Sequence, residues 1–245
     1  MHPDTPADPS FASTGAIFRR GLLASLPFTV MILPFGALFG VLATAQGMSV
    51  AEAMAFSIVV IAGASQFAAL QLMQEGAPIA LIILTATAVN LRMAMYSVAL
   101  TPHLGQAKLW QRALIAYFLV DQSYVLGAAE YARQPLWGLS EKLAWYFGVI
   151  SPVCGLWYVA TWAGATFGRA LPAGLPLDFI VPVSFLAMVS PLLRTWAHRA
   201  AAAVSVGGTL ALWWMPYSSG LLVAALAAMI VGALVEIHEE KRRGA

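Results

Sequence analysis

The length of the stretches without charge constrains this chain more than any other feature. Residues Ala200–Val235 contain no Asp, Glu, Lys or Arg, and a run of that length suits a pair of membrane segments rather than a soluble core helix. Of the 245 residues, 60% are hydrophobic and 10% are charged, whereas soluble domains carry about 25% charged residues. The sequence therefore predicts an all-α polytopic membrane bundle that lies mostly within the bilayer.

Charged residues and Gly/Pro clusters divide the chain into about eight apolar segments. Two are unsuited to a simple crossing, because 50–74 is interrupted at Ala62–Ser65 and 178–193 is short and contains two prolines. Both are predicted to be broken or re-entrant, which is tolerated where the backbone is buried in protein. The approximate bounds of all the segments are 18–45, 50–74, 77–100, 110–130, 143–168, 178–193, 200–214 and 217–236.

The distribution of charged and apolar residues also predicts the domain organisation and the topology. Residues 1–14 form a disordered leader, 15–240 a single transmembrane domain and 241–245 a basic cytoplasmic tail. If both broken segments enter and leave on one side, all four basic clusters and both termini become cytoplasmic, and loop 130–142 lies outside. The alternative is that two of the clusters violate the positive-inside rule. The clusters are Arg19–Arg20, Lys108 with Arg112, Arg194 with Arg199, and Lys241–Arg243.

A short repeat is present in two of the apolar segments. Gly36-Ala-Leu-Phe-Gly40 recurs as Gly164-Ala-Thr-Phe-Gly168, and each copy precedes one of the segments predicted to be broken. With the topology above, the first copy enters the membrane from inside and the second from outside. This predicts a four-plus-four inverted repeat, a recurring design among transporters.

Arg92 lies within the apolar segment 77–100, two residues after Asn90. A guanidinium at membrane depth costs about 3 kcal/mol on insertion scales, so a chain keeps one only where another group compensates it. Arg92 either meets a carboxylate, from a substrate or from the protein, or it is a structural residue that pairs inside the bundle or snorkels to the interface.

Three further sites carry polar groups into apolar sequence. Ser65 and Gln66 belong to the small-residue run 62–67, which either exposes backbone groups to an amino acid's charged ends or forms a close helix-packing seam. Asp121 is either a proton carrier, if burial keeps it neutral, or the permanent ion-pair partner of Arg92. Asp178 is predicted to be a helix N-cap.

Several classes of function are excluded by the residues. The single cysteine, Cys154, allows no internal disulfide, and the sequence has no metal-ligand spacing and no nucleophile–base arrangement. The formal charge is +2 and no basic cluster is interleaved with aromatic residues, so nucleic acid is not an expected partner. We expect neither an enzyme nor a cofactor or metal.

The order of the motifs resembles the AzlC family, the large subunits of bacterial branched-chain amino acid exporters. The resemblance covers about residues 15–243, and its motif residues map to Gln66, Asn90, Arg92, Asp121 and Asp178. This chain has Gln122 where the family often has an acidic residue. The motifs are Leu33-Pro-Phe-Gly36, Ala62-Gly-Ala-Ser-Gln-Phe67, Asn90-Leu-Arg92, Asp121 and Leu177-Asp-Phe179.

The resemblance implies efflux of valine, leucine and isoleucine, with methionine as a further candidate, across the bacterial inner membrane. It also implies an ion gradient as the driving force and a small hydrophobic AzlD-like subunit as the partner. The predicted substrate site lies near mid-bilayer, and Asp121 is the predicted coupling or charge-pairing acid. A passive channel or facilitator and a non-transporting assembly protein are the alternatives. The substrate-binding residues are predicted to be Phe35, Ser65, Gln66, Phe67, Asn90 and Arg92.

Overall fold

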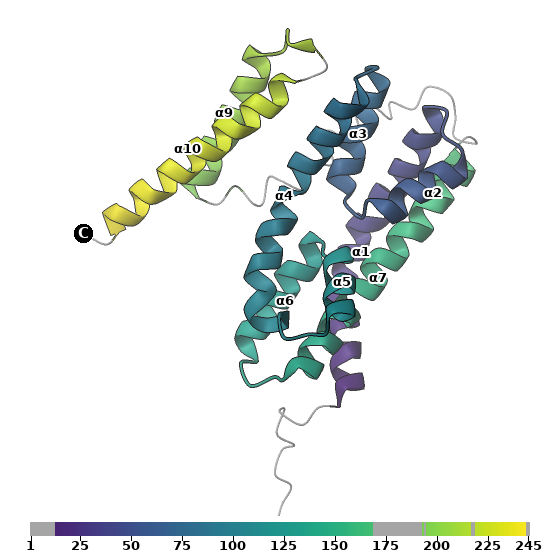
Figure 1. The fold of residues 1–245 in the computed structure, drawn as a ribbon, viewed down its shortest axis with the longest axis vertical. Helices are drawn as coiled ribbons and strands as arrows, with labels where there is room; N and C mark the ends of the chain where they lie inside the picture. The colour runs from purple at the N-terminus through teal and green to yellow at the C-terminus, as the bar shows by residue number, and fades with distance from the viewer. Residues whose placement is uncertain (1–12, 169–192, 194, 217–218, 244–245) are drawn as a thin grey trace, which may run out of the picture. The chain divides into compact units, whose positions relative to one another are not determined.

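The computed structural model describes residues 13–168, 193, 195–216 and 219–243 (Figure 1). Every regular element in these ranges is a helix, as the composition predicted. The segment predicted at 178–193, including Asp178, lies outside the described residues. The helices are α1 (Thr14–Ala45), α2 (Val50–Val59), α3 (Gly63–Gln74), α4 (Ile79–Leu104), α5 (Leu109–Tyr117), α6 (Asp121–Arg133), α7 (Leu139–Phe167), α9 (Trp196–Ala211) and α10 (Gly220–Arg243).

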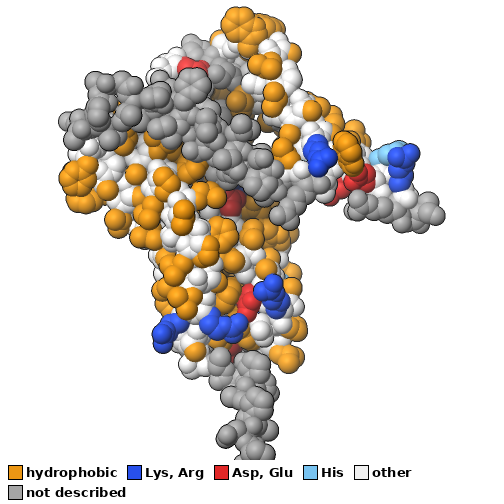
Figure 2. All heavy atoms as spheres, turned by 180° about the vertical axis from the view of Figure 1, so that it is seen from behind, with side chains coloured by type: hydrophobic (Ala, Val, Ile, Leu, Met, Phe, Trp, Pro, Cys, Tyr) orange, Lys and Arg blue, Asp and Glu red, His pale blue; other side chains and the backbone are white. Residues whose placement is uncertain are grey.

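Four of the described helices are long and apolar enough to cross a bilayer: α1, α4, α7 and residues Gly220–Glu239 of α10. Large apolar side chains point outward from them; Val30 is 79% exposed and Val98 is 73% exposed. Figure 2 shows these hydrophobic side chains covering much of one face. Such a surface is suited to lipid rather than water. The described residues thus contain four candidate spans, and the predicted count of about eight apolar segments is not confirmed.

Two of the predicted segments are interrupted helices. Segment 50–74 consists of α2 and α3, separated at residues 60–62. The structure thus confirms a break in this segment, but it lies before most of the predicted Ala62–Ser65 run, which is helical from Gly63. Segment 110–130 was predicted to be continuous, and that prediction is wrong, because residues 118–120 separate α5 from α6. Ser123 starts the new helix: its hydroxyl accepts the Val120 N–H at 3.0 Å and donates to the Val120 carbonyl at 2.8 Å. Neither α5 nor α6 is long enough to cross a bilayer.

Helices α1 and α7 pack closely along a seam of glycines. A Cβ on Gly21 would meet the Trp145 carbonyl, and one on Gly36 would meet the Trp157 carbonyl. A Cβ on Gly164 would collide with the backbone of Ala37. The residue numbers of the contacting positions increase together along the two helices, so α1 and α7 run parallel (Figure 1).

The parallel packing corrects the predicted repeat. The two five-residue copies lie on helices that run in the same direction, so an inverted repeat cannot relate them. They recur because each helix needs small residues where the two backbones approach. Gly40 of the first copy faces Thr161 and Gly164, while Gly168 of the second faces Val41.

The position predicted for loop 130–142 is also wrong. Arg20, in the second turn of α1, forms an ion pair with Glu130 at 2.9 Å. The Arg20 guanidinium also lies 5.9 Å from the Trp137 ring centroid and 6.0 Å from that of Trp145. Two groups in contact cannot be on opposite sides of a membrane, so the loop lies at the end where α1 begins. The reason is the unpredicted break, because α5 and α6 return the chain to that end.

Helices α9 and α10 belong to a second compact unit, which also includes residues 71–85. Gly208 of α9 faces Ala224 of α10, and Gly232 of α10 faces Ala201 of α9. The contacting positions run in opposite directions, so the two helices pack antiparallel through small residues.

Replacing Gly164 with alanine is expected to lower stability by about 1–3 kcal/mol, because the added methyl group overpacks the α1–α7 seam. Gly155 of the same helix is a matched control, since a Cβ there has nothing within 4 Å. Gly155→Ala should be neutral or stabilising by up to about 1 kcal/mol. Thermal unfolding of the detergent-solubilised protein measures both. Equal melting temperatures for the two variants would refute the seam.

Candidate functional site

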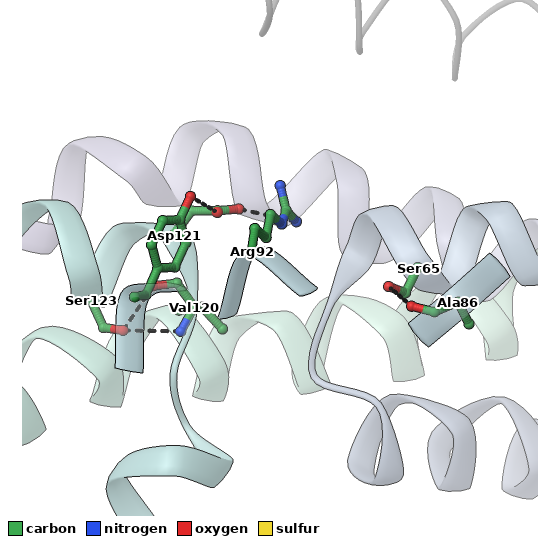
Figure 3. Close-up of polar contacts among 7 residues, drawn as sticks. Ser65, Ala86, Arg92, Val120, Asp121 and Ser123 are labelled. Atoms are coloured by element: carbon green, nitrogen blue, oxygen red, sulfur yellow. Dashed lines mark hydrogen bonds and ion pairs between the residues drawn. The ribbon is translucent and has the colours of Figure 1, made fainter. Parts of the chain in front are cut away.

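The charged centre of the chain is an ion pair between α4 and α6. Arg92 Nη2 lies 3.3 Å from Asp121 Oδ2, and the side chains are 33% and 38% exposed respectively. Figure 3 shows the two groups pointing toward one another. Of the two roles considered for Asp121, the structure shows the ion pair. Arg92 is therefore compensated by a protein carboxylate, as a guanidinium in an apolar segment requires.

The break before α6 gives Asp121 two further favourable contacts. Asp121 is the first residue of α6, where the helix dipole stabilises a negative charge. The Tyr96 hydroxyl, from α4, donates to Asp121 Oδ1 at 3.0 Å. The Tyr96 ring stacks on Tyr124 with centroids 4.1 Å apart and an angle of 8°. A cation, a hydroxyl donor and a helix N-terminus thus all meet at the Asp121 carboxylate.

The break before α3 brings the predicted small-residue run against α4. The Ser65 hydroxyl, which is fully buried, donates to the Ala86 carbonyl at 3.0 Å (Figure 3). Ala86 and Asn90 are four residues apart on α4 and share a helix face. The start of α3 therefore lies on the Asn90 face of α4.

Gln66 is fully buried within a polar network that the sequence did not predict. Its Nε2 donates to Ser57 Oγ at 3.0 Å, and the Trp157 indole N–H donates to the same oxygen at 3.3 Å. Ser57 Oγ also lies 3.3 Å from Thr161 Oγ1. The network ties α2, α3 and α7 together at the first break. Ser57 and Thr161 gave no signal in the sequence, because single hydroxyls are common in apolar helices.

Three buried polar atoms have no hydrogen-bond partner among the described residues: Gln66 Oε1, Asn90 Oδ1 and Arg92 Nε. Buried polar groups are almost always paired, so each exception calls for an explanation. Two of these atoms are acceptors and one is a cationic donor. All three belong to residues that the sequence predicted to bind substrate.

The predicted apolar residues lie beside the first break. Phe67 of α3 makes edge-to-face contacts with Phe35 at 6.1 Å and with Phe39 at 5.9 Å between centroids. Phe39 also lies 5.6 Å from Phe56 and 6.5 Å from Trp157. An aromatic cluster is thus built around the residue that follows Gln66, and the sequence predicted only part of it.

The described residues contain no group of three or more His, Cys, Asp or Glu side chains that would hold a metal ion. The site contains one ion pair, two amide oxygens without a hydrogen-bond partner and an aromatic cluster. Interrupted membrane helices that carry polar groups at their breaks are a recurring feature of transport proteins. The fold and the site define a polytopic helical membrane protein consistent with a role in transport.

Comparison with known proteins assigns the family. The sequence model of the AzlC protein family matches residues 27–171. The chain is 29% identical to inner membrane protein YgaZ of Escherichia coli (strain K12), over 97% of this chain and 96% of that protein. It is 33% identical to an uncharacterized membrane protein of Archaeoglobus fulgidus, over 89% of this chain and 95% of that protein. No solved structure matches. This chain belongs to the AzlC family.

A double-mutant cycle on Arg92→Gln and Asp121→Asn should give a coupling of about 1 kcal/mol, because both side chains are only partly buried. Each single variant should lose stability and the double variant should recover part of it. The Arg20–Glu130 pair, at 2.9 Å, is a matched control for an ion pair at the end of the bundle. Thermal or denaturant unfolding in detergent gives the energies. Strictly additive effects at Arg92 and Asp121 would show that the pair is not energetically coupled.

Proposed function

We propose that this chain is the large subunit of a secondary amino acid exporter. Its substrates are the branched-chain amino acids valine, leucine and isoleucine, with methionine as a further candidate. It works in the inner membrane with a small hydrophobic AzlD-like subunit. The substrate class, the direction of transport and the partner rest on the family resemblance. The inner-membrane location is supported by the name of the Escherichia coli relative.

One observation carries the proposal: the partnerless buried atoms match the two ends of an amino acid. Gln66 Oε1 and Asn90 Oδ1 are acceptors, and a substrate ammonium group has three donors for them. Arg92 Nε is a further donor of the guanidinium, and the ion pair with Asp121 uses Nη2 instead. A substrate carboxylate can accept from Nε while the ion pair persists, because guanidinium offers several donors in one plane.

Charge balance and the aromatic cluster support the same substrate class. Arg92 and Asp121 neutralise one another, so a zwitterion adds no net charge to a site at membrane depth. Phe35 of α1 and Phe67, which follows Gln66 on α3, provide an apolar surface for a branched aliphatic side chain. Ser65 holds the first break against α4 and thereby positions Gln66.

Arg92→Ala and Asn90→Ala are each expected to reduce valine efflux about tenfold or more, the effect of losing a hydrogen bond to a charged group. Arg112→Ala is the matched control, because Arg112 is exposed on α5. Efflux from valine-loaded cells at matched expression measures the effect. If both site variants clear valine at the wild-type rate, the proposed site is wrong.

Counterflow in liposomes, with and without the partner subunit, tests the chemistry of recognition. Valine should exchange, whereas valinamide lacks the carboxylate for Arg92 and isovalerate lacks the ammonium for the amide oxygens. Equal exchange of the three compounds would exclude recognition of a zwitterion. Efflux that persists after the ion gradient is dissipated would indicate a facilitator.

A further inference from the structure

The order of helices between residues 50 and 167 occurs twice. Each set consists of a short helix, a break, a second short helix, a turn and a long helix, in that order. The first set is α2 with 10 residues, α3 with 12 and α4 with 26. The second set is α5 with 9 residues, α6 with 13 and α7 with 29. The breaks, at 60–62 and 118–120, have the same length.

Each pair of short helices folds back on itself at its break. In the first hairpin (Val50–Gln74), Phe56 before the break and Phe67 after it both contact Phe39. In the second hairpin (Leu109–Arg133), the Ile115 carbonyl accepts from Tyr146 at 2.7 Å. After that break, the Leu126 carbonyl accepts from the adjacent Trp145 at 3.2 Å. The two arms of each hairpin thus share a neighbour on a long helix.

The hairpins enter from opposite ends of α1. The first follows directly from the C-terminal end of α1 at Ala45. The second lies at the end where α1 begins, because Glu130 pairs with Arg20. If the two sets are related by inversion, their long helices must also run in opposite directions.

The long helices meet this requirement. Contacts of α4 with α6 advance together, from Arg92 with Asp121 to His103 with Tyr131, whose rings lie 5.2 Å apart. Helices α6 and α7 are antiparallel, because the later residue of α6 contacts the earlier residue of α7. Tyr131 donates to the Lys142 carbonyl, and Trp145 donates to the Leu126 carbonyl. Helix α4 is therefore antiparallel to α7.

The tips of the two hairpins meet. The hydroxyl of Tyr117, the last residue of α5, donates to the carbonyl of Ile58 at 2.7 Å. Ile58 is one residue before the end of α2, so the contact joins the last turns of the first short helix in the two sets. Tyr158 of α7 approaches the Tyr117 hydroxyl at 3.5 Å.

We propose that residues 50–104 and 109–167 are inverted copies of one unit, and that Tyr117 latches their two tips together. The Ile58 carbonyl is one of the last four of α2, which the helix itself leaves unpaired. Breaking the latch exposes this carbonyl and separates the tips, beside which Gln66 and Asp121 lie. This last step of the inference rests on the proposed function: separation of the tips opens the substrate site.

Sided cysteine labelling tests the inversion without any transport assay. Single cysteines are introduced into a Cys154→Ala background at the ends of the hairpins and labelled in intact cells and in inverted vesicles. The first two positions should react from one side of the membrane and the last two from the other. If either pair is split between the sides, that hairpin spans the membrane and the inversion is refuted. The positions are Ala45, Gln74, Gln106 and Leu136.

The latch is tested with the native Cys154, which is 5% exposed and lies one turn before Tyr158 on α7. Tyr117→Phe should raise the rate of Cys154 modification by a small thiol reagent roughly fivefold, the factor that one neutral hydrogen bond supplies. Tyr131→Phe is the matched control, because it removes a tyrosine–carbonyl bond of 2.9 Å away from the tips. An unchanged rate in Tyr117→Phe, or an equal increase in Tyr131→Phe, would overturn the latch. If the wild-type protein does not export valine, the proposed function is wrong. The two labelling experiments still test the inversion and the latch, because neither measures transport.

Discussion

The need to pair every backbone amide and carbonyl inside the membrane governs this structure. Two helices are interrupted, at 60–62 and 118–120, and each break frees groups that lipid cannot satisfy. Side chains from other helices pair several of them: Tyr117 donates to the Ile58 carbonyl and Tyr146 to that of Ile115. Ser123 pairs both the amide and the carbonyl of Val120. The breaks persist because the surrounding helices supply these donors and acceptors.

The same breaks explain how the chain tolerates charge in apolar segments. A helix that starts within the bundle presents its N-terminus there, and Asp121 occupies that position in α6. Arg92 then has a carboxylate within 3.3 Å on a neighbouring helix. Asp121 also has a second partner, because it accepts a hydrogen bond from the Tyr96 hydroxyl. A structural role of Arg92 is therefore compatible with the proposed binding role, since Nη2 contacts Asp121 while Nε has no partner among the described residues.

The sequence predicted the features that depend on local composition. The small-residue run at 62–65 marked the first break, and the isolation of Arg92 pointed to a partner such as Asp121. The sequence did not predict the second break, because residues 118–120 are apolar and the interruption depends on a cap that Ser123 makes only in the folded state. That single miss placed loop 130–142 on the wrong side, since charge counting alone cannot distinguish a crossing from a hairpin. The Ser57 network was missed because it joins residues about 100 positions apart.

The two kinds of repetition in this chain have different physical origins. The five-residue motif at Gly36 and Gly164 is repeated in sequence because two parallel helices need small residues at the same contact. The unit of α2–α4 and α5–α7 is repeated in helix lengths and break positions, and its two copies have no such motif in common. Side chains of the two copies face different neighbours, whereas backbone pairing at the breaks imposes the same requirement on both. In a membrane protein of this kind, symmetry is therefore more readily found in where helices stop than in which residues they contain.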